Sequence, residues 1–93
     1  MAITVRVPTQ LRSLTNGVSE VTVNGENVGE ALADLGDQFP GLSDRIFDDS
    51  GAIRRFVNIF LADEDVRFLD GPQTKVSDSQ VISIVPAVAG GAF

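Results

Sequence analysis

The residues of this chain best suited to a chemical role are Gly90 and Gly91, which stand in the segment IVPAVAGGAF. Glycine has no Cβ, so a backbone containing two of them fits a narrow channel and keeps φ unrestricted. Pro86 precedes them. It fixes φ and lacks an N–H, so it ends sheet pairing and leaves the segment less entropy to lose on binding. Extended at ~3.3 Å per residue, residues 86–91 span about 20 Å. Such a segment can reach a buried site from a folded body.

The side chains that most enzymes use are missing. The sequence contains no cysteine and no histidine, so a disulfide, a zinc knuckle, a thiol nucleophile and the usual general base are excluded. Serines are present, but no plausible base accompanies them. The acids at 48–49 and 63–65 have neither a calcium-loop spacing nor a histidine beside them. The sequence therefore predicts a protein that is not an enzyme and holds no metal or other bound cofactor.

The charge of the chain limits its partners. The 93 residues suit one small domain, with thirteen acids, seven bases and a net charge of −6. This balance argues against nucleic acid and anionic membranes, and leaves open a basic protein partner or simple solubility. The first ten residues show no signal peptide, and no apolar run approaches the ~20 residues of a membrane helix. We expect a cytoplasmic protein.

Two strands that form a hairpin are predicted near the start of the chain. Apolar residues alternate with polar ones over 3–7 and again over 21–23, which is the period of a half-buried strand. Pro8 ends the first strand because proline cannot donate to a ladder. Asn16-Gly17 is a turn signal between the two.

A helix is predicted to follow. Asn27 can cap it, and Glu30, three positions on, completes a capping-box pattern. Its apolar residues recur at intervals of four, three and four, and so line one face: Val28, Leu32, Leu35 and Phe39. Gly36 is predicted to pack closely against a sheet. Pro40-Gly41 ends the helix, and residues 42–47 add a short second turn or helix.

The second half of the chain predicts three more strands. Residues 57–61 alternate, ADED turns the chain, and Val66 and Phe68 return on a partner strand. The last strand covers 81–85 and is stopped by Pro86. A helix that follows a hairpin most simply covers one face of a mixed sheet. We therefore predict an α+β protein of the β-grasp (ubiquitin-like) type, with four to five strands packed on one main helix. Residues 1–86 form the domain and 87–93 a flexible tail.

The alternation also predicts a docking surface. If residues 57, 59 and 61 face the helix, Phe56, Asn58 and Phe60 face outward on the same sheet. On the last strand residues 82 and 84 fit the core, which puts Val85 on Phe60's side. Phe56, Phe60 and Val85 would then form an apolar patch for a partner, unless the chain itself covers Phe60. The acids at 63–65 either steer a basic partner or keep the turn soluble.

The order of elements, together with VNIFLADEDVRFLDG and ISIVPAVAGG, resembles the ThiS/MoaD family of ubiquitin-like sulfur carriers. The resemblance covers nearly the whole chain, and its strongest part is a strand, a proline and an apolar lead that run into Gly-Gly. Within this family, the sequence most resembles the carriers that serve cysteine synthesis.

The resemblance implies a function for the tail. A ubiquitin-activating-like enzyme would use ATP to adenylate the Gly91 carboxylate, which then becomes a thiocarboxylate that gives sulfur to an accepting synthase. Pro86, Val88 and Gly90 would thread the tail into these partners. Family members normally end at the second glycine, whereas Ala92-Phe93 follow it here. The resemblance implies that a JAMM-type zinc metallopeptidase hydrolyses the Gly91–Ala92 bond.

Three alternatives stay open on the sequence. The chain could be a ubiquitin-like modifier joined to lysines through Gly91, because that reaction begins with the same adenylate. It could serve molybdopterin or thiamine synthesis. It could also be a small interaction module whose tail is incidental.

Overall fold

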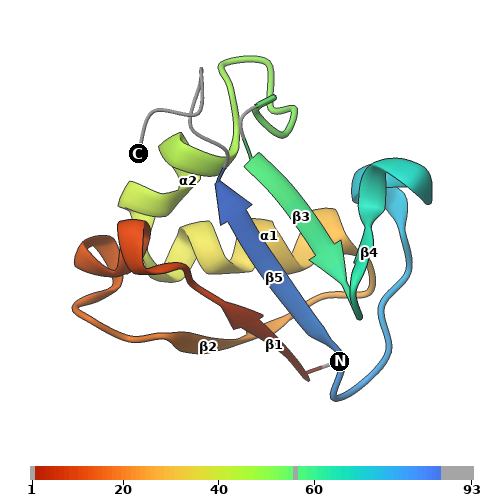
Figure 1. Cartoon of the computed structure of the whole chain (residues 1–93), viewed down its shortest axis with the longest axis horizontal. Helices are drawn as coiled ribbons and strands as arrows, with labels where there is room; N and C mark the ends of the chain where they lie inside the picture. Colours follow the sequence, from red (N-terminus) through yellow and green to blue (C-terminus); the bar gives the residue numbers. More distant parts are fainter. Residues whose placement is uncertain (1, 56, 87–93) are drawn as a thin grey trace.

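The computed structural model describes residues 2–55 and 57–86. Figure 1 shows its α-helices and strands, and η denotes a short 3₁₀ helix. They follow the chain in this order: β1 (Ala2–Arg6), η1 (Thr9–Thr15), β2 (Glu20–Asn24), α1 (Val28–Gln38), α2 (Pro40–Ile46), β3 (Val57–Leu61), β4 (Glu64–Asp65), η2 (Val66–Phe68), η3 (Gly71–Gln73) and β5 (Val81–Pro86). The predicted tail, 87–93, lies outside the described residues.

The strands form one mixed sheet in the order β2-β1-β5-β3-β4. The central strands β1 and β5 are parallel, and each other neighbouring pair is antiparallel. Both α-helices pack on one face of the sheet (Figure 1). This is the β-grasp arrangement, so the predicted α+β fold class, the opening hairpin and the single main helix are confirmed.

The core lies between the sheet and the two α-helices. It takes alternate residues from the strands because successive side chains point to opposite faces. The largest side chains that are fully buried there include Ile3, Val5, Val23, Leu32, Leu35, Leu42, Ile46, Ile59 and Ile82.

Helix α1 begins as the sequence predicts. Asn27 Oδ1 accepts a hydrogen bond from the Glu30 N–H at 2.8 Å, and Glu30 Oε1 accepts one from the Glu26 N–H at 3.0 Å. The first bond satisfies a donor that the first turn would otherwise leave unpaired, and the second joins Glu30 to the residue before the cap. The apolar face is confirmed, except that Phe39 ends the helix as its cap and is only half-buried.

The prediction for Gly36 is wrong in its partner. A Cβ at this position would lie 3.1 Å from Ser43 Cβ, which belongs to α2. The close packing is therefore between the two helices and not against the sheet. Pro40 ends α1 but also opens α2, where its missing N–H costs no hydrogen bond.

The predicted return strand at Val66 and Phe68 is also wrong. The part of the returning chain that pairs with β3 is limited to β4, and residues 66–68 turn into η2. The Asp65 carboxylate causes this turn, because Oδ1 accepts the Arg67 N–H at 2.9 Å and so caps the new helix. Val66 then points into the core, while Phe68 is 86% exposed.

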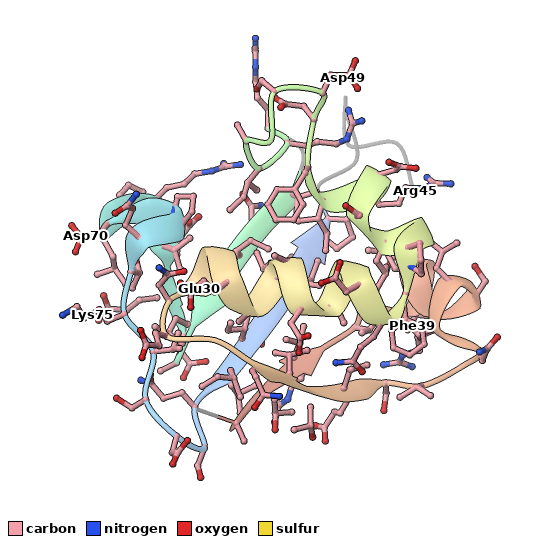
Figure 2. All side chains as sticks on the ribbon, turned by 180° about the vertical axis from the view of Figure 1, so that it is seen from behind. Glu30, Phe39, Arg45, Asp49, Asp70 and Lys75 are labelled. Atoms are coloured by element: carbon pink, nitrogen blue, oxygen red, sulfur yellow. The ribbon has the colours of Figure 1, made fainter. Side chains whose placement is uncertain are left out.

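Charged side chains surround this body. Seen from behind, Asp49, Asp70 and Lys75 lie at its periphery, and Glu30 lies over the start of α1 (Figure 2). Only the Arg6–Glu20 pair is within ion-pair distance among the described residues. The charged side chains that give the net charge of −6 therefore lie largely on the solvated surface.

Candidate docking face and tail origin

The outer face of β3 and β5 carries the predicted apolar residues. Phe60 lies opposite Ser83, and Val85 lies opposite Asn58. Phe60 is half-buried and Val85 is 44% exposed. The predicted assignment of strand faces is therefore confirmed. The docking role of Phe60 and Val85 stays a prediction.

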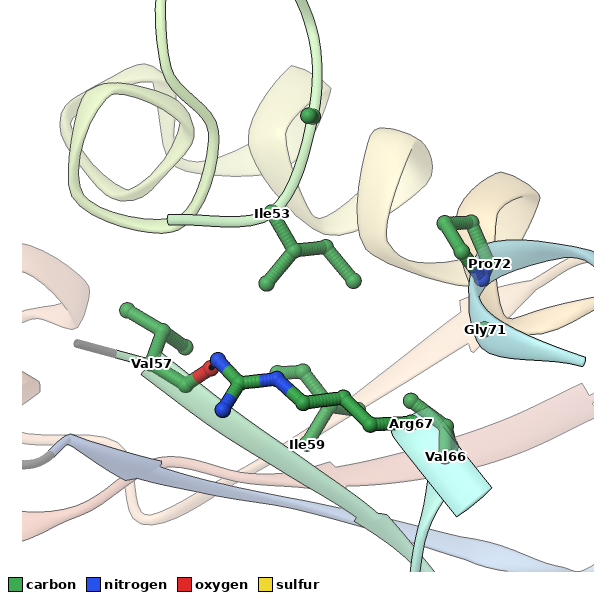
Figure 3. A pocket seen from close by; sticks show the side chains of 8 residues that line it. Ile53, Val57, Ile59, Val66, Arg67, Gly71 and Pro72 are labelled. Carbon is green, nitrogen blue, oxygen red and sulfur yellow. Dashed lines mark hydrogen bonds between the residues drawn. The ribbon is translucent and has the colours of Figure 1, made fainter. Parts of the chain in front are cut away.

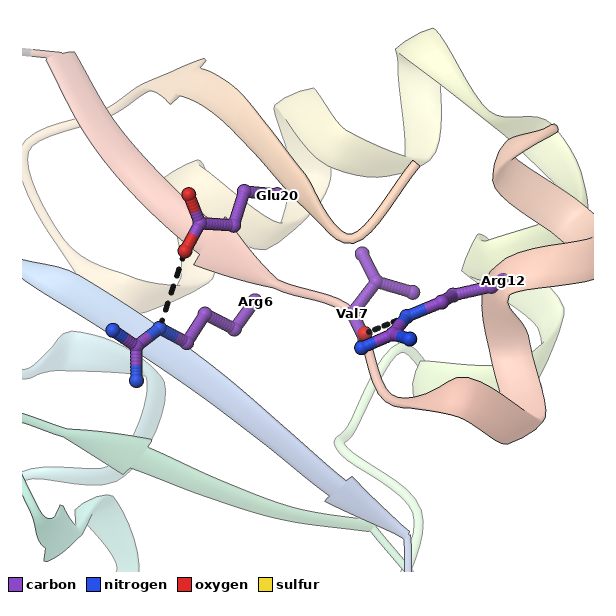
Figure 4. Close-up of polar contacts among 4 residues, drawn as sticks. All are labelled: Arg6, Val7, Arg12 and Glu20. Atoms are coloured by element: carbon purple, nitrogen blue, oxygen red, sulfur yellow. Dashed lines mark hydrogen bonds and ion pairs between the residues drawn. The ribbon is translucent and has the colours of Figure 1, made fainter. Parts of the chain in front are cut away.

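A polar row crosses the same face. Phe60 lies opposite Ser83, Ser83 lies beside Arg6, and Arg6 lies opposite Glu20. Arg6 Nε is 3.4 Å from Glu20 Oε2 (Figure 4), and both side chains are more than half exposed. An exposed pair of this kind contributes about 0–1 kcal/mol to stability. The pair places a positive and a negative charge beside the apolar residues of the outer face. The sequence signal for this charged pair was the alternation of β1, which places the Arg6 side chain on the outer face.

The predicted tail begins where β5 ends. The strand runs one residue further than predicted, since Pro86 lies opposite Val57 as the last residue of β5. Ala62 donates to Val81, and hydrogen-bonded pairs alternate along an antiparallel ladder. The Val57–Pro86 pair therefore falls at a non-hydrogen-bonded position, where a missing N–H costs no bond to β3.

Arg67 was not singled out from the sequence, yet it organises the start of β3. Its Nη1 donates to Asn58 Oδ1 at 3.0 Å. Its Nη2 donates to the carbonyl oxygens of Arg55 and Val57, both at 2.9 Å, and to that of Arg54 at 3.4 Å. These acceptors lie 9–13 residues away in the chain, so no local pattern could have revealed them.

An apolar pocket of about 250 Å³ opens beside Arg67 (Figure 3). Its walls are made by side chains from the loop before β3, from β3 itself and from the η2–η3 segment: Ala52, Ile53, Val57, Ile59, Val66, Arg67, Gly71 and Pro72. A second, more open groove of about 510 Å³ lies between α1 and residues 47–51.

Three acids, Asp37, Asp48 and Asp49, line the second groove. The Asp48 carboxylate accepts the Ser50 hydroxyl at 2.6 Å and the Ala52 N–H at 3.1 Å. These hydrogen bonds lower the pKa of Asp48. The carboxylate thus shapes its own loop. Within 2–55 and 57–86, no group of three acids, histidines or cysteines could hold a metal ion.

Five of the predicted site residues lie outside the part of the chain that the structure describes. They are Phe56, Val88, Gly90, Gly91 and Ala92. Among residues 2–55 and 57–86, none of the helices has the length and apolar character of a transmembrane span.

Known proteins resemble this chain along almost its whole length. The model of the ThiS family matches residues 5–91. Sulfur carrier protein CysO of Mycobacterium tuberculosis is 44% identical over 93 residues, covering 98% of this chain and 100% of that protein.

Two solved structures have the same fold. The crystal structure of the Amycolatopsis orientalis BexX/CysO complex contains a chain with a TM-score of 0.89 and 39% identity, covering 97% of this chain and 100% of that chain. The solution structure of small archaeal modifier protein 1 from Methanosarcina acetivorans has a TM-score of 0.85 and 31% identity, covering 97% and 96%. The fold, the family match up to Gly91 and the full-length identity lead to one conclusion: this chain belongs to the ThiS family.

Proposed function

We propose that this protein is a sulfur carrier whose working group is the carboxylate of Gly91. The observation that supports this best is the extent of the family match, which ends at Gly91 and leaves Ala92 and Phe93 outside it. The 44% identity to a sulfur carrier protein supports the same function, in cysteine synthesis or a related pathway. The lack of cysteine and histidine fits a protein that presents a group to enzymes and is not one itself.

The chemistry begins with hydrolysis. In the sequence as printed, Gly91 is joined to Ala92 by a peptide bond, so its carbonyl is an amide. A JAMM-type metallopeptidase would add water across this bond and release Ala92-Phe93. The new Gly91 carboxylate is then a nucleophile that the unprocessed chain lacks.

Activation and sulfur transfer follow. The Gly91 carboxylate attacks the α-phosphorus of ATP on a ubiquitin-activating-like partner, which forms an acyl adenylate and releases pyrophosphate. A sulfide donor attacks the acyl carbon and displaces AMP, leaving a thiocarboxylate. In the accepting synthase its sulfur attacks an electrophilic carbon of the substrate and displaces the leaving group of that substrate, which forms a thioester. Water later hydrolyses the thioester, which restores the Gly91 carboxylate and frees the product as a thiol.

The folded body supplies docking and reach. Phe60 and Val85 would contact each partner on the outer face, with Phe56 beside them, and Pro86 would direct the tail away from the sheet. Val88 and Gly90 would line the way to the partner's nucleotide or substrate site. A relative of this chain forms a complex with BexX, which supports a partner-bound mode of action. We place the carrier in the cytoplasm, where ATP is available.

Intact mass spectrometry of the protein recovered from its native cell tests the proposal. We expect a species that ends at Gly91 and is heavier than the free acid by the oxygen-to-sulfur mass difference. Recovery of full-length protein alone, even when sulfur demand is high, contradicts it. Lysines of other proteins carrying Gly91 in isopeptide linkage would identify a modifier in place of a carrier.

A further inference from the structure

The last residues of β5 depend on one neighbouring strand. Strand β1 pairs with β5 only as far as Ser83. Beyond that point the described residues pair β5 with β3 alone, through Val85 opposite Asn58 and Pro86 opposite Val57. The direction in which the chain leaves the sheet is therefore set by the first two residues of β3.

Those two residues have little support from the rest of the sheet. Strand β4 pairs with Phe60 and Leu61 and does not reach the start of β3. At Val57, the edge of β3 that faces away from β5 is hydrogen-bonded to a side chain and not to a strand. Arg67 donates there to the Val57 carbonyl and to Asn58 Oδ1.

Arg67 is itself held in place from both sides. Its N–H is bound by Asp65 Oδ1 at 2.9 Å, and its neighbour Val66 is buried in the core. Its guanidinium also donates to the carbonyls of Arg54 and Arg55 and so fixes the approach to β3. Arginine suits this task because its planar group offers five donors in a fixed geometry.

We propose that Arg67 is a positioning residue for the delivery of the tail. It holds Val57 and Asn58 against Val85 and Pro86, and so fixes the point and direction from which residues 87–91 set out. The inference rests on the proposed function, since it concerns how the Gly91 carboxylate reaches the reacting atoms of a partner. Pro86 is the last residue that the structure describes, so a shift of Pro86 moves the anchor of residues 87–91 by the same amount. Even a 1 Å misplacement can slow a reaction by about 100-fold.

The test compares Arg67→Ala and Arg67→Lys in protein that ends at Gly91. Arg12→Ala is the matched control, because Arg12 Nε also donates to a backbone carbonyl, that of Val7, at 3.1 Å but on another part of the fold (Figure 4). ATP–pyrophosphate exchange by the cognate activating enzyme gives kcat and KM for each carrier. Amide hydrogen exchange of residues 57–59 and 84–85 is measured on the free proteins.

We expect Arg67→Ala to lower kcat about tenfold or more while KM for the carrier changes less than about threefold, since Phe60 and its partner Ser83 lie outside the residues that Arg67 contacts. Arg67→Lys restores part of the rate because one ammonium can serve only some of the four acceptors. Exchange at 57–59 and 84–85 becomes faster in Arg67→Ala, and Arg12→Ala matches wild type in all three measurements.

Other outcomes overturn the inference. A merely unfolded fraction would raise KM and leave kcat unchanged, because less competent carrier would be present. Wild-type kcat in Arg67→Ala, or unchanged exchange at 57–59 and 84–85, shows that Arg67 does not position the tail. If wild-type protein ending at Gly91 supports no exchange with the activating enzyme, the proposed function fails first, and this inference falls with it.

Discussion

Val85 lies directly opposite Asn58 in the ladder between β5 and β3. This pair joins the two parts of the candidate site, because Val85 is exposed on the outer face and immediately precedes Pro86. The surface that would contact a partner and the origin of the tail are therefore parts of one rigid strand pair.

Replacing Phe60 tests the docking face. We expect Phe60→Ala to raise the KM of the activating enzyme for the carrier about tenfold, since loss of an apolar anchor costs about 1–2 kcal/mol of binding free energy. Steady-state kinetics on protein ending at Gly91 measures this. Val18→Ala removes a side chain that is 42% exposed but lies outside the sheet, and should leave KM unchanged. Equal KM values for the two variants would contradict the docking role.

The position of the chain end tests the chemistry of the tail. Protein ending at Gly91 should support ATP–pyrophosphate exchange, whereas the 93-residue protein should not, because its Gly91 carbonyl is an amide. Protein ending at Ala89 should fold with an unchanged Tm and remain inactive. Exchange by the 93-residue protein, verified as intact by mass, would show that removal of Ala92-Phe93 is not required.

The contact between α1 and α2 is open to a stability test. A Cβ at Gly36 would lie 3.1 Å from Ser43 Cβ, and the branched side chain of Gly36→Val would reach further. We expect a loss of about 1–3 kcal/mol in the free energy of unfolding, as for overpacked cores. Urea unfolding measures it. Ala33→Val, at an exposed position of the same helix, should cost about 0.5 kcal/mol or less. Valine has a higher helix propensity than glycine, so a loss in Gly36→Val no larger than that in Ala33→Val would show that the contact with α2 does not restrict this position.

The pH dependence of stability should contain a contribution from Asp48. Hydrogen bonds from Ser50 and Ala52 hold the pKa of Asp48 below its ordinary value of 3.8. Since the folded pKa is the lower one, the stabilisation is complete above the unfolded pKa and is lost as pH falls through the folded pKa. Asp48→Asn should therefore lower Tm at pH 7 and converge with wild type at the most acidic pH where both still fold.

Thermal unfolding of wild type, Asp48→Asn and Asp49→Asn across this pH range provides the check. The exposed Asp49 serves as the control for loss of one charge in the same loop. A Tm difference between wild type and Asp48→Asn that stays constant with pH would show that the hydrogen bonds, and not the ionised carboxylate, stabilise the loop.

The sequence was sufficient for most of the architecture because its signals are local. The alternation of residues 57–61 and 81–85 assigned the inner and outer faces of the strands correctly, since side chains in a strand point to opposite sides. The cap of α1 was visible as Asn27 and Glu30, three positions apart. The Gly-Gly segment and the resemblance that it carries also lie in a single stretch of chain.

Only the tertiary structure decided which elements meet. Gly36 packs on α2, residues 66–68 leave the sheet, and the end of β5 rests on β3 alone. Arg67 joins groups 9–13 residues away in the chain. A periodic pattern says which side of an element is buried, but it does not say which partner buries it or which edge stays uncovered. Those outcomes depend on contacts between distant segments, and such contacts exist only once the chain has closed its sheet around the helix.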